Sequence, residues 1–312
     1  MNMKRYSQCR VISATDSVRL HSQSLAVILT IILALLPKVI AHDGPEEVLT
    51  TLNSAILRNG PTADLLFRRA TEFRAMRDYK RAAADLSYAV RLDSSMEIAR
   101  LELARLQLHL LQSASASNDK VTDYNQPIKT VEPLLSSSDT AIRIASLALR
   151  GEIYMAANHW TSAIEDLSIA LESRPEVQWY LWLAEAQQHS NEYVASVEGL
   201  RIADARTQSP VIKAALCDAM IGAIRHSLAT DVTSAEMIRE AASIISVELS
   251  TSRLKSAWQI RHAELLLLCD DRHQAETELH AAIDELNARL QTQRPDPALL
   301  RDRDRAVKLL NP

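Results

Sequence analysis

The stretch LALRGEIYMAANHWTSAIEDLSIALESRP, residues 147–175, holds two helix-forming segments joined by a short polar turn. Gly151 in the first segment is followed twelve residues later by Ala163, and Ala170 comes seven residues after that. The residues Ala163, Leu167 and Ala170 have the spacing i, i+4, i+7, which places them on one face of a helix. Since small residues let two helix backbones approach closely, the stretch predicts a pair of packed antiparallel helices.

The same spacing of small residues occurs three more times in the chain. The further triplets are Ala70, Ala82, Ala89; Ala184, Ser196, Ala203; and Ala263, Ala275, Ala282. A leucine follows each middle residue by four positions, and an aromatic residue precedes it by three in every unit except the last. A repeat of this kind indicates an array of helix pairs in which each pair packs on its neighbours.

This pattern resembles the tetratricopeptide repeat family, and in particular exported repeat proteins of the bacterial type. The family motif places bulky, small and aromatic residues in a first helix, followed by Ala, Phe and Pro in a second. The stretch from Leu147 to Pro175 follows the motif most clearly, and the resemblance extends over roughly residues 63–290. It implies an all-α fold, a right-handed α-solenoid of antiparallel helix pairs. The chain contains only five glycines, as is typical of a helical protein.

The chain divides into a leader, a repeat array and two terminal caps. We expect residues 42–62 to form an N-terminal capping helix and residues 63–209 to form repeats 1–4, with a polar loop insert at 112–123. Residues 210–294 read as diverged repeats 5 and 6. The last segment, 295–312, is rich in Arg and Asp and is interpreted as a C-terminal solvating helix, because a terminal unit needs a polar outer face.

Residues 1–41 have the order of a secretory signal peptide. Basic residues come first, a mostly apolar run from Leu25 to Leu36 follows, and the small residue Ala41 precedes polar sequence. We therefore predict cleavage after Ala41 and export to a periplasm or the exterior. A retained membrane anchor is the alternative, although a spanning helix needs about 20 apolar residues and Pro37-Lys38 ends this run earlier.

The net charge narrows the classes of possible partner, and the cysteine content leaves a disulfide open. The leader holds five of the 35 basic and one of the 39 acidic residues, so the remaining chain has a formal net charge of −8. An acidic array has no electrostatic reason to bind nucleic acid or an anionic membrane. Cys217 and Cys269 remain after cleavage. They could pair in an oxidising compartment, although two buried free thiols are the simpler interpretation of their apolar surroundings.

The sequence offers little catalytic chemistry. It contains no zinc-protease motif, no glycine-rich phosphate loop and no nucleophile elbow, so we predict a non-enzymatic protein without metal or cofactor. His42 supplies too few ligands for a metal site, and the cluster from Cys269 to His273 sits at a turn where polar residues are ordinary. Glu165 and Asp166 are interpreted as part of a solvated face.

The resemblance also implies a binding surface, because first helices in this family line a concave groove. The slots around each small residue predict a bound peptide or protein segment contacting Phe67, Thr71, Arg74, Leu101, Arg105, Leu108, Glu152, Met155, Leu181, Glu185 and Gln188. This row is basic at its start, apolar in the middle and acidic toward Glu264. The carboxylate clamp of some family members is not expected, because Phe67, Thr71 and Leu101 depart from its pattern.

The sequence therefore predicts an exported protein-interaction scaffold whose partner is a protein or peptide, with no nucleic acid and no membrane contact after cleavage. Two alternatives stay open. One is an enzyme or metal-handling accessory with its site in residues 210–312, and the other is a structural subunit of an envelope assembly.

Overall fold

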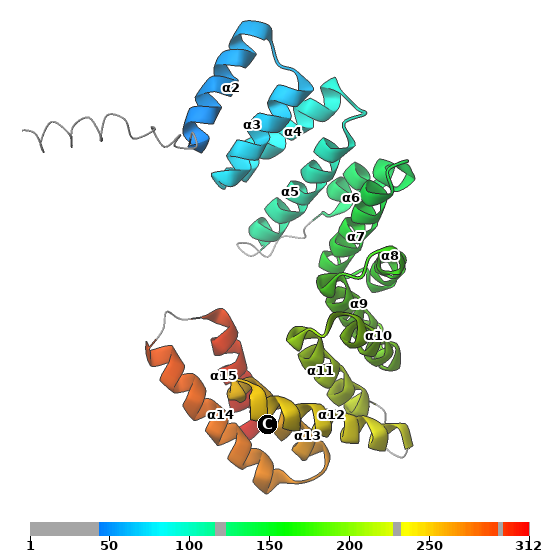
Figure 1. Cartoon of the computed structure of the whole chain (residues 1–312), viewed down its shortest axis with the longest axis vertical. Coiled ribbons are helices and arrows are strands. Elements are labelled where there is room, and N and C mark those ends of the chain that lie inside the picture. Colours follow the sequence, from blue (N-terminus) through cyan, green and yellow to red (C-terminus); the bar gives the residue numbers. More distant parts are fainter. Residues whose placement is uncertain (1–43, 116–122, 227–231, 293–295, 312) are drawn as a thin grey trace, which may run out of the picture.

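The computed structural model describes residues 44–115, 123–226, 232–292 and 296–311, and these residues form helices and turns without a strand. The predicted signal peptide lies outside the described residues. The helices are arranged as an open arc, with α2–α5 at one end and α13–α15 at the other (Figure 1). The all-α solenoid predicted from the repeat spacing is confirmed.

The helices follow one another closely along the chain. In order they are α2 (Pro45–Asn59), α3 (Ala63–Ala75), α4 (Tyr79–Leu92), α5 (Glu97–Ser115), α6 (Asn125–Val131), the 3-10 helix η1 (Glu132–Ser136), α7 (Thr140–Ala156), α8 (Trp160–Ser173), α9 (Val177–His189), α10 (Tyr193–Thr207), α11 (Pro210–His226), α12 (Val232–Thr251), α13 (Lys255–Leu268), α14 (Arg272–Thr292) and α15 (Pro297–Leu310).

Consecutive helices pack as pairs: α3 with α4, α5 with α6, α7 with α8, α9 with α10, α11 with α12, and α13 with α14. In Figure 1 the first helices α7, α9 and α11 lie on the inner side of the arc, and their partners α8, α10 and α12 lie on the outer side. Each pair also packs on the next, so the array forms one continuous curved body.

The small residues lie where the helix backbones approach each other. The middle residues Ala82, Ala163, Ser196 and Ala275 are all fully buried. A Cβ atom added to Gly151 would lie only 2.8 Å from Cγ of Leu167, closer than carbon atoms can pack. The recurring spacing therefore marks the contact between the two helices of a pair.

The turn between the two helices is the same in four units. The residue five positions before each middle small residue has a left-handed backbone, with φ near 60° at Arg77, Asn158, Asn191 and Asp270. In each case the next backbone N–H donates to the carbonyl five residues back, as His159 N–H does to Tyr154 O at 2.8 Å. This is the Schellman arrangement, which satisfies carbonyls at a helix end.

A second regularity, which the sequence analysis missed, links the two helices of a pair. Arg150 donates two hydrogen bonds of 2.7 Å to Asp166, and Arg69 donates two of the same length to Asp85. Both pairs are 16 residues apart and occupy equivalent positions in the third and first units. Asp166 is therefore a buried, paired residue, and its interpretation as part of a solvated face is wrong.

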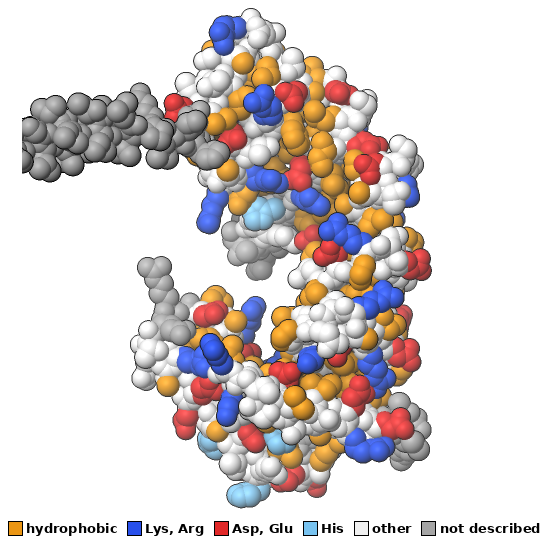
Figure 2. Space-filling view, in the orientation of Figure 1, with side chains coloured by type: hydrophobic (Ala, Val, Ile, Leu, Met, Phe, Trp, Pro, Cys, Tyr) orange, Lys and Arg blue, Asp and Glu red, His pale blue; other side chains and the backbone are white. Residues whose placement is uncertain are grey.

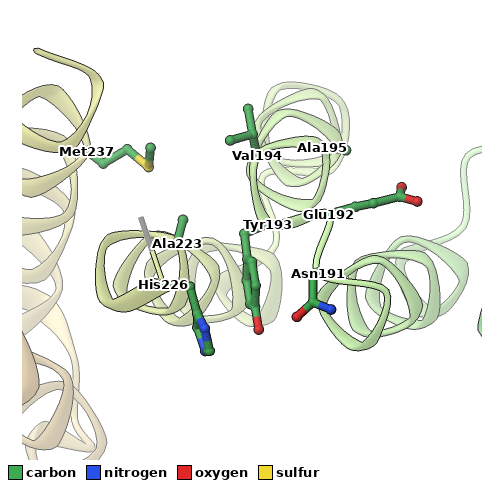
Figure 3. A pocket seen from close by; sticks show the side chains of 8 residues that line it. All are labelled: Asn191, Glu192, Tyr193, Val194, Ala195, Ala223, His226 and Met237. Carbon is green, nitrogen blue, oxygen red and sulfur yellow. The ribbon is translucent and has the colours of Figure 1, made fainter. Parts of the chain in front are cut away.

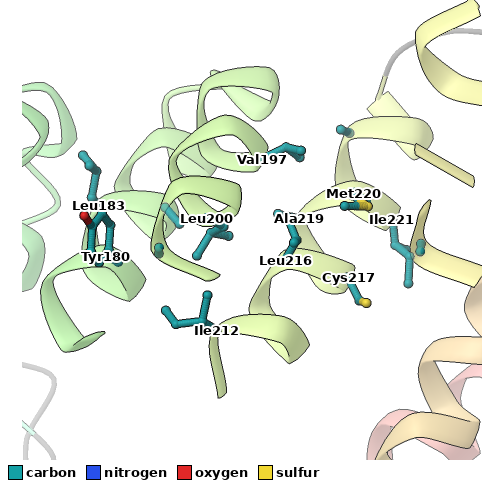
Figure 4. Close-up of a cluster of buried hydrophobic side chains, with 14 of the residues drawn as sticks. Tyr180, Leu183, Val197, Leu200, Ile212, Leu216, Cys217, Ala219, Met220 and Ile221 are labelled. Carbon is teal, nitrogen blue, oxygen red and sulfur yellow. The ribbon is translucent and has the colours of Figure 1, made fainter. Parts of the chain in front are cut away.

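The apolar interior is divided into four clusters of buried side chains along the array. The largest runs from α8 to α13 and includes Leu167, Leu200, Ile212 and Met220; Figure 4 shows its central part, where α9, α10 and α11 meet. Two smaller clusters lie in α2–α5 and in α5–α7, and the fourth lies between α13, α14 and α15.

Two local expectations need correction. The polar insert predicted at 112–123 begins later, because α5 continues to Ser115.

The expectation of two buried thiols holds for only one of the two cysteines. Cys217 is buried, and desolvation raises the pKa of its thiol to about 12. Cys269, by contrast, is exposed at the end of α13, and the two thiols are free. The exposed position follows from the turn at Asp270, which directs the chain to the surface.

The described ranges contain neither a membrane-spanning helix nor a cluster of metal-binding side chains. No helix there is long and apolar enough to cross a membrane. No group of three or more His, Cys, Asp or Glu side chains in this part of the chain is arranged to hold a metal ion.

Candidate functional site

The inner side of the arc is an open surface (Figure 2). Figure 2 shows it as a wide opening between the two ends of the molecule, with Lys and Arg side chains on both sides. First helices of successive pairs supply its walls, as the resemblance to the repeat family implied. We refer to this inner side as the concave surface and describe it from its N-terminal to its C-terminal end.

At the N-terminal end, a hollow of about 330 Å³ lies between α3 and α5. Three of the predicted binding residues, Phe67, Thr71 and Arg74, line it together. The opposite wall comes from α5, and Glu102 is its acidic member. Arg74 donates to one oxygen of Glu102, while Arg105 donates to the other at 2.7 Å. Two cations thus share one carboxylate, which leaves a single excess positive charge at this end.

Two predicted binding residues of α5 do not reach the concave surface. Leu101 and Leu108 are each 3% exposed and pack in the same cluster as Val131 and Leu149. The prediction was wrong because α6, η1 and α7 cover this side of α5. Leu101 and Leu108 are therefore core residues, and Arg105 is the exposed α5 member of the predicted row.

The middle of the concave surface is acidic and partly apolar. Met155 and Leu181 are half-buried and pack against the largest apolar cluster. Burial raises the pKa of Glu152, and the nearby positive charge of Arg105 opposes that rise. Glu185 is exposed. Gln188 is half-buried and donates to the Ser196 hydroxyl at 3.1 Å, so its amide is partly committed to the fold.

At the C-terminal end, a second hollow of about 320 Å³ is lined by α9, α10, α11, α13 and α15. Its polar wall is a network in which three arginines share two carboxylates. Arg305 donates to Glu264 at 2.6 Å and to Asp218 at 3.0 Å. Arg225 approaches the other oxygen of Glu264 at 3.3 Å, and Arg261 donates to Asp218 at 2.6 Å.

This network overturns two expectations. Glu264 is 5% exposed and is held by Arg305 and Arg225, so it cannot supply an exposed acidic end to the groove. The expectation of a purely solvating C-terminal helix is also wrong, because Arg305 of α15 donates to Asp218 in α11 and to Glu264 in α13. Sequence analysis missed this arrangement because Asp218 and Arg305 are 87 residues apart and neither occupies a repeat slot.

Aromatic–histidine contacts recur where neighbouring pairs meet. The first residue of a second helix contacts a histidine near the end of the following first helix, in the pairs Tyr79–His109, Trp160–His189 and Tyr193–His226. In the last of these the rings are stacked, with centroids 4.4 Å apart. Figure 3 shows Tyr193 and His226 side by side in a hollow of about 570 Å³ between α10, α11 and α12. The turn aromatics therefore join successive pairs as well as filling the turn.

Comparison with solved structures defines the class of fold. A tetratricopeptide repeat protein from Parabacteroides merdae is similar over 84% of this chain and 92% of its own, with 12% identity and a TM-score of 0.51. The C-terminal part of a repeat-containing protein from Cytophaga hutchinsonii is similar over 86% of this chain and 89% of its own, with 12% identity and a TM-score of 0.46.

No family model and no curated protein matches the sequence. The helix pairs and the similarity to the Parabacteroides structure nevertheless give this chain the fold of tetratricopeptide repeat proteins.

Proposed function

We propose that this protein is an exported scaffold that binds a segment of another protein along its concave surface. The observation that supports this most is the lining of that surface. Side chains from successive first helices border hollows at both ends of one open face. Helical repeat arrays commonly bind extended ligands on such a face, because each unit adds contact area without closing a pocket.

The charges along this face favour a segment of defined direction. At the N-terminal end Arg74 and Arg105 share Glu102, which leaves one excess positive charge, and the middle has Glu152 and Glu185. Complementary charges on a ligand would fix its orientation and increase its rate of association, while affinity would come mainly from a few buried contacts. Arg74 and Arg105 are both exposed, and Glu185 is the exposed member of the acidic group. Arg105 and Glu185 come from different first helices and serve as the probes of this idea.

Reversing these two charges should abolish partner capture. The double variant Arg105→Glu with Glu185→Lys keeps the net charge and changes two exposed side chains on the concave surface. The mature protein, immobilised and exposed to envelope extract from the cells that produce it, should capture partners that this variant loses. Mass spectrometry of the captured proteins provides the measurement.

A matched control makes the same charge exchange on the second helices. Lys80→Glu in α4 with Glu165→Lys in α8 alters exposed residues of the outer row and also keeps the net charge. This variant should capture the same proteins as the parent chain. If the two variants behave alike, the concave surface is not the binding surface, and the outer face or the polar insert becomes the better candidate.

Export should produce a chain that begins at His42. This expectation follows from the order of charge, apolar run and Ala41 in the leader. Intact-mass measurement of protein recovered from the exported fraction would detect the loss of residues 1–41. Recovery of the full-length chain in membranes alone would replace cleavage by a retained anchor.

A further inference from the structure

A cationic pocket with an apolar floor lies beside the C-terminal hollow, between α11, α13, α14 and α15. Its volume is about 600 Å³. The apolar lining comes from three leucines, two at the end of α13 and one in α15: Leu267, Leu268 and Leu309. The polar lining is mostly basic and includes Arg225, Arg272 and Lys308.

Ion pairing leaves this pocket with an excess of positive charge. Arg305 is occupied by Glu264 and Asp218. Arg225 shares Glu264 at 3.3 Å, but its side chain is 52% exposed. Arg272 and Lys308 are exposed, and neither has an ion pair with any acidic group that the structure describes. The neighbouring Asp271 side chain accepts from the Gln274 N–H at 3.2 Å, so it caps α14.

A basic pocket stands out in a chain that is acidic as a whole, with a formal net charge of −4. The repeat pattern predicts an acidic end here, with Glu264 in the row of groove residues and the terminal helix as a solvating cap. The structure inverts this polarity. Glu264 is neutralised by two arginines, while Lys308 from α15 and Arg272 from α14 face the same hollow.

We propose that this pocket receives an acidic segment of the partner protein that carries a bulky apolar side chain next to its carboxylates. The leucine floor would hold the apolar side chain, and Arg225, Arg272 and Lys308 would pair with the carboxylates. The inference rests on the proposed function and adds the chemistry of the ligand at this end.

Continuity with the concave surface favours a polypeptide as the ligand. The pocket shares Arg225, Glu264 and Arg305 with the C-terminal hollow. The two hollows therefore adjoin, and a chain that lies along the concave surface would need to extend only past these shared side chains to reach the pocket. Guanidinium and ammonium groups bind carboxylates through charge-assisted hydrogen bonds, and the nearby apolar floor lowers the exposure of those bonds to water.

Selection from a random peptide library tests the ligand class. The probe is a phage-displayed library of dodecapeptides panned on the mature protein, followed by affinity measurement of the selected peptides by fluorescence anisotropy. The expected peptides combine Asp or Glu with an adjacent Leu, Ile, Phe or Met. Their binding should weaken by about tenfold or more in the variant Arg272→Glu with Lys308→Glu, and it should weaken with added salt.

The control variant reverses a charge about two turns earlier in the same helix, outside the pocket lining. Arg301→Glu changes an exposed residue of α15 that does not line the pocket, and it should leave the affinity within about twofold. Because Arg272 and Lys308 have no ion pair among the described residues, the double variant should keep the helical circular dichroism and melting temperature of the parent chain.

Any other result contradicts one named part of the proposal: the pocket, the scaffold function or the class of ligand. Selected peptides that lack acidic residues, or that bind the double variant as well as the parent chain, would overturn the pocket assignment while leaving a peptide-binding scaffold. Failure to select any peptide would count against the proposed function itself. Binding of oleate or of phosphatidylglycerol vesicles through Arg272 and Lys308, without peptide binding, would replace the peptide by an anionic lipid.

Discussion

Replacing Leu167 with alanine should lower the free energy of unfolding by about 2–5 kcal/mol, as expected for a fully buried leucine. Leu167 is completely buried and its side chain fills the space above Gly151, where an added Cβ would lie 2.8 Å from it. Thermal and urea unfolding monitored by circular dichroism would measure the loss.

A matched control exists two residues further along the same helix. Ile169 is a large aliphatic residue of α8 that is 50% exposed, and Ile169→Ala should change stability by no more than about 0.5–1 kcal/mol. The comparison holds helix, chemistry and position nearly constant and varies burial. Equal losses in the two variants would mean that the assigned register of the helix pair is wrong.

Replacing Arg150 with methionine should be the second large effect, with a loss of about 2–4 kcal/mol. Asp166 has a side chain that is only 4% exposed, and Arg150 itself is 22% exposed. Removal of the guanidinium leaves a buried carboxylate without its two hydrogen bonds of 2.7 Å. Breaking one half of such a pair is more costly than replacing the whole pair by apolar groups.

Two further variants distinguish the cost of leaving the buried Asp166 carboxylate unpaired from the effect of removing an arginine at the surface. Arg174→Met breaks the ion pair with Glu176, whose two side chains are 64% and 40% exposed, and it should have almost no effect on stability. The double variant Arg150→Met with Asp166→Leu should recover part of the loss, because it removes the stranded carboxylate. A double variant as unstable as Arg150→Met alone would show that packing, and not charge, dominates at this site.

The helix pairs could be predicted from sequence because their signal is local. Close approach of two backbones requires a small side chain, and this requirement recurs at fixed spacing in Gly151 with Ala163 and in Ala70 with Ala82. The left-handed turns were harder to predict. Asn158 suits that conformation, but Arg77 adopts it as well, because the packing of the two helices determines the turn and outweighs the preference of the residue.

The surface positions proposed for binding could be predicted only in part, because a repeat motif gives the position of a residue along its helix but not what covers that helix. Phe67, Thr71 and Arg74 do share one hollow. Leu101 is buried instead, because α6, η1 and α7 pack over the side of α5 on which Leu101 lies. At the other end, Arg225 and Lys308 line one pocket from helices far apart in the chain, and no local pattern encodes that arrangement.

The division of the interior into four apolar clusters has a consequence for how such a chain can change over evolutionary time. In a globular domain one shared core couples most buried positions, so a substitution in one place restricts the choices in many others. Here the cluster around α13, α14 and α15 shares no buried side chain with the cluster of α2–α5. The two ends can therefore acquire different ligand chemistries independently, while the intervening pairs keep them at a fixed separation.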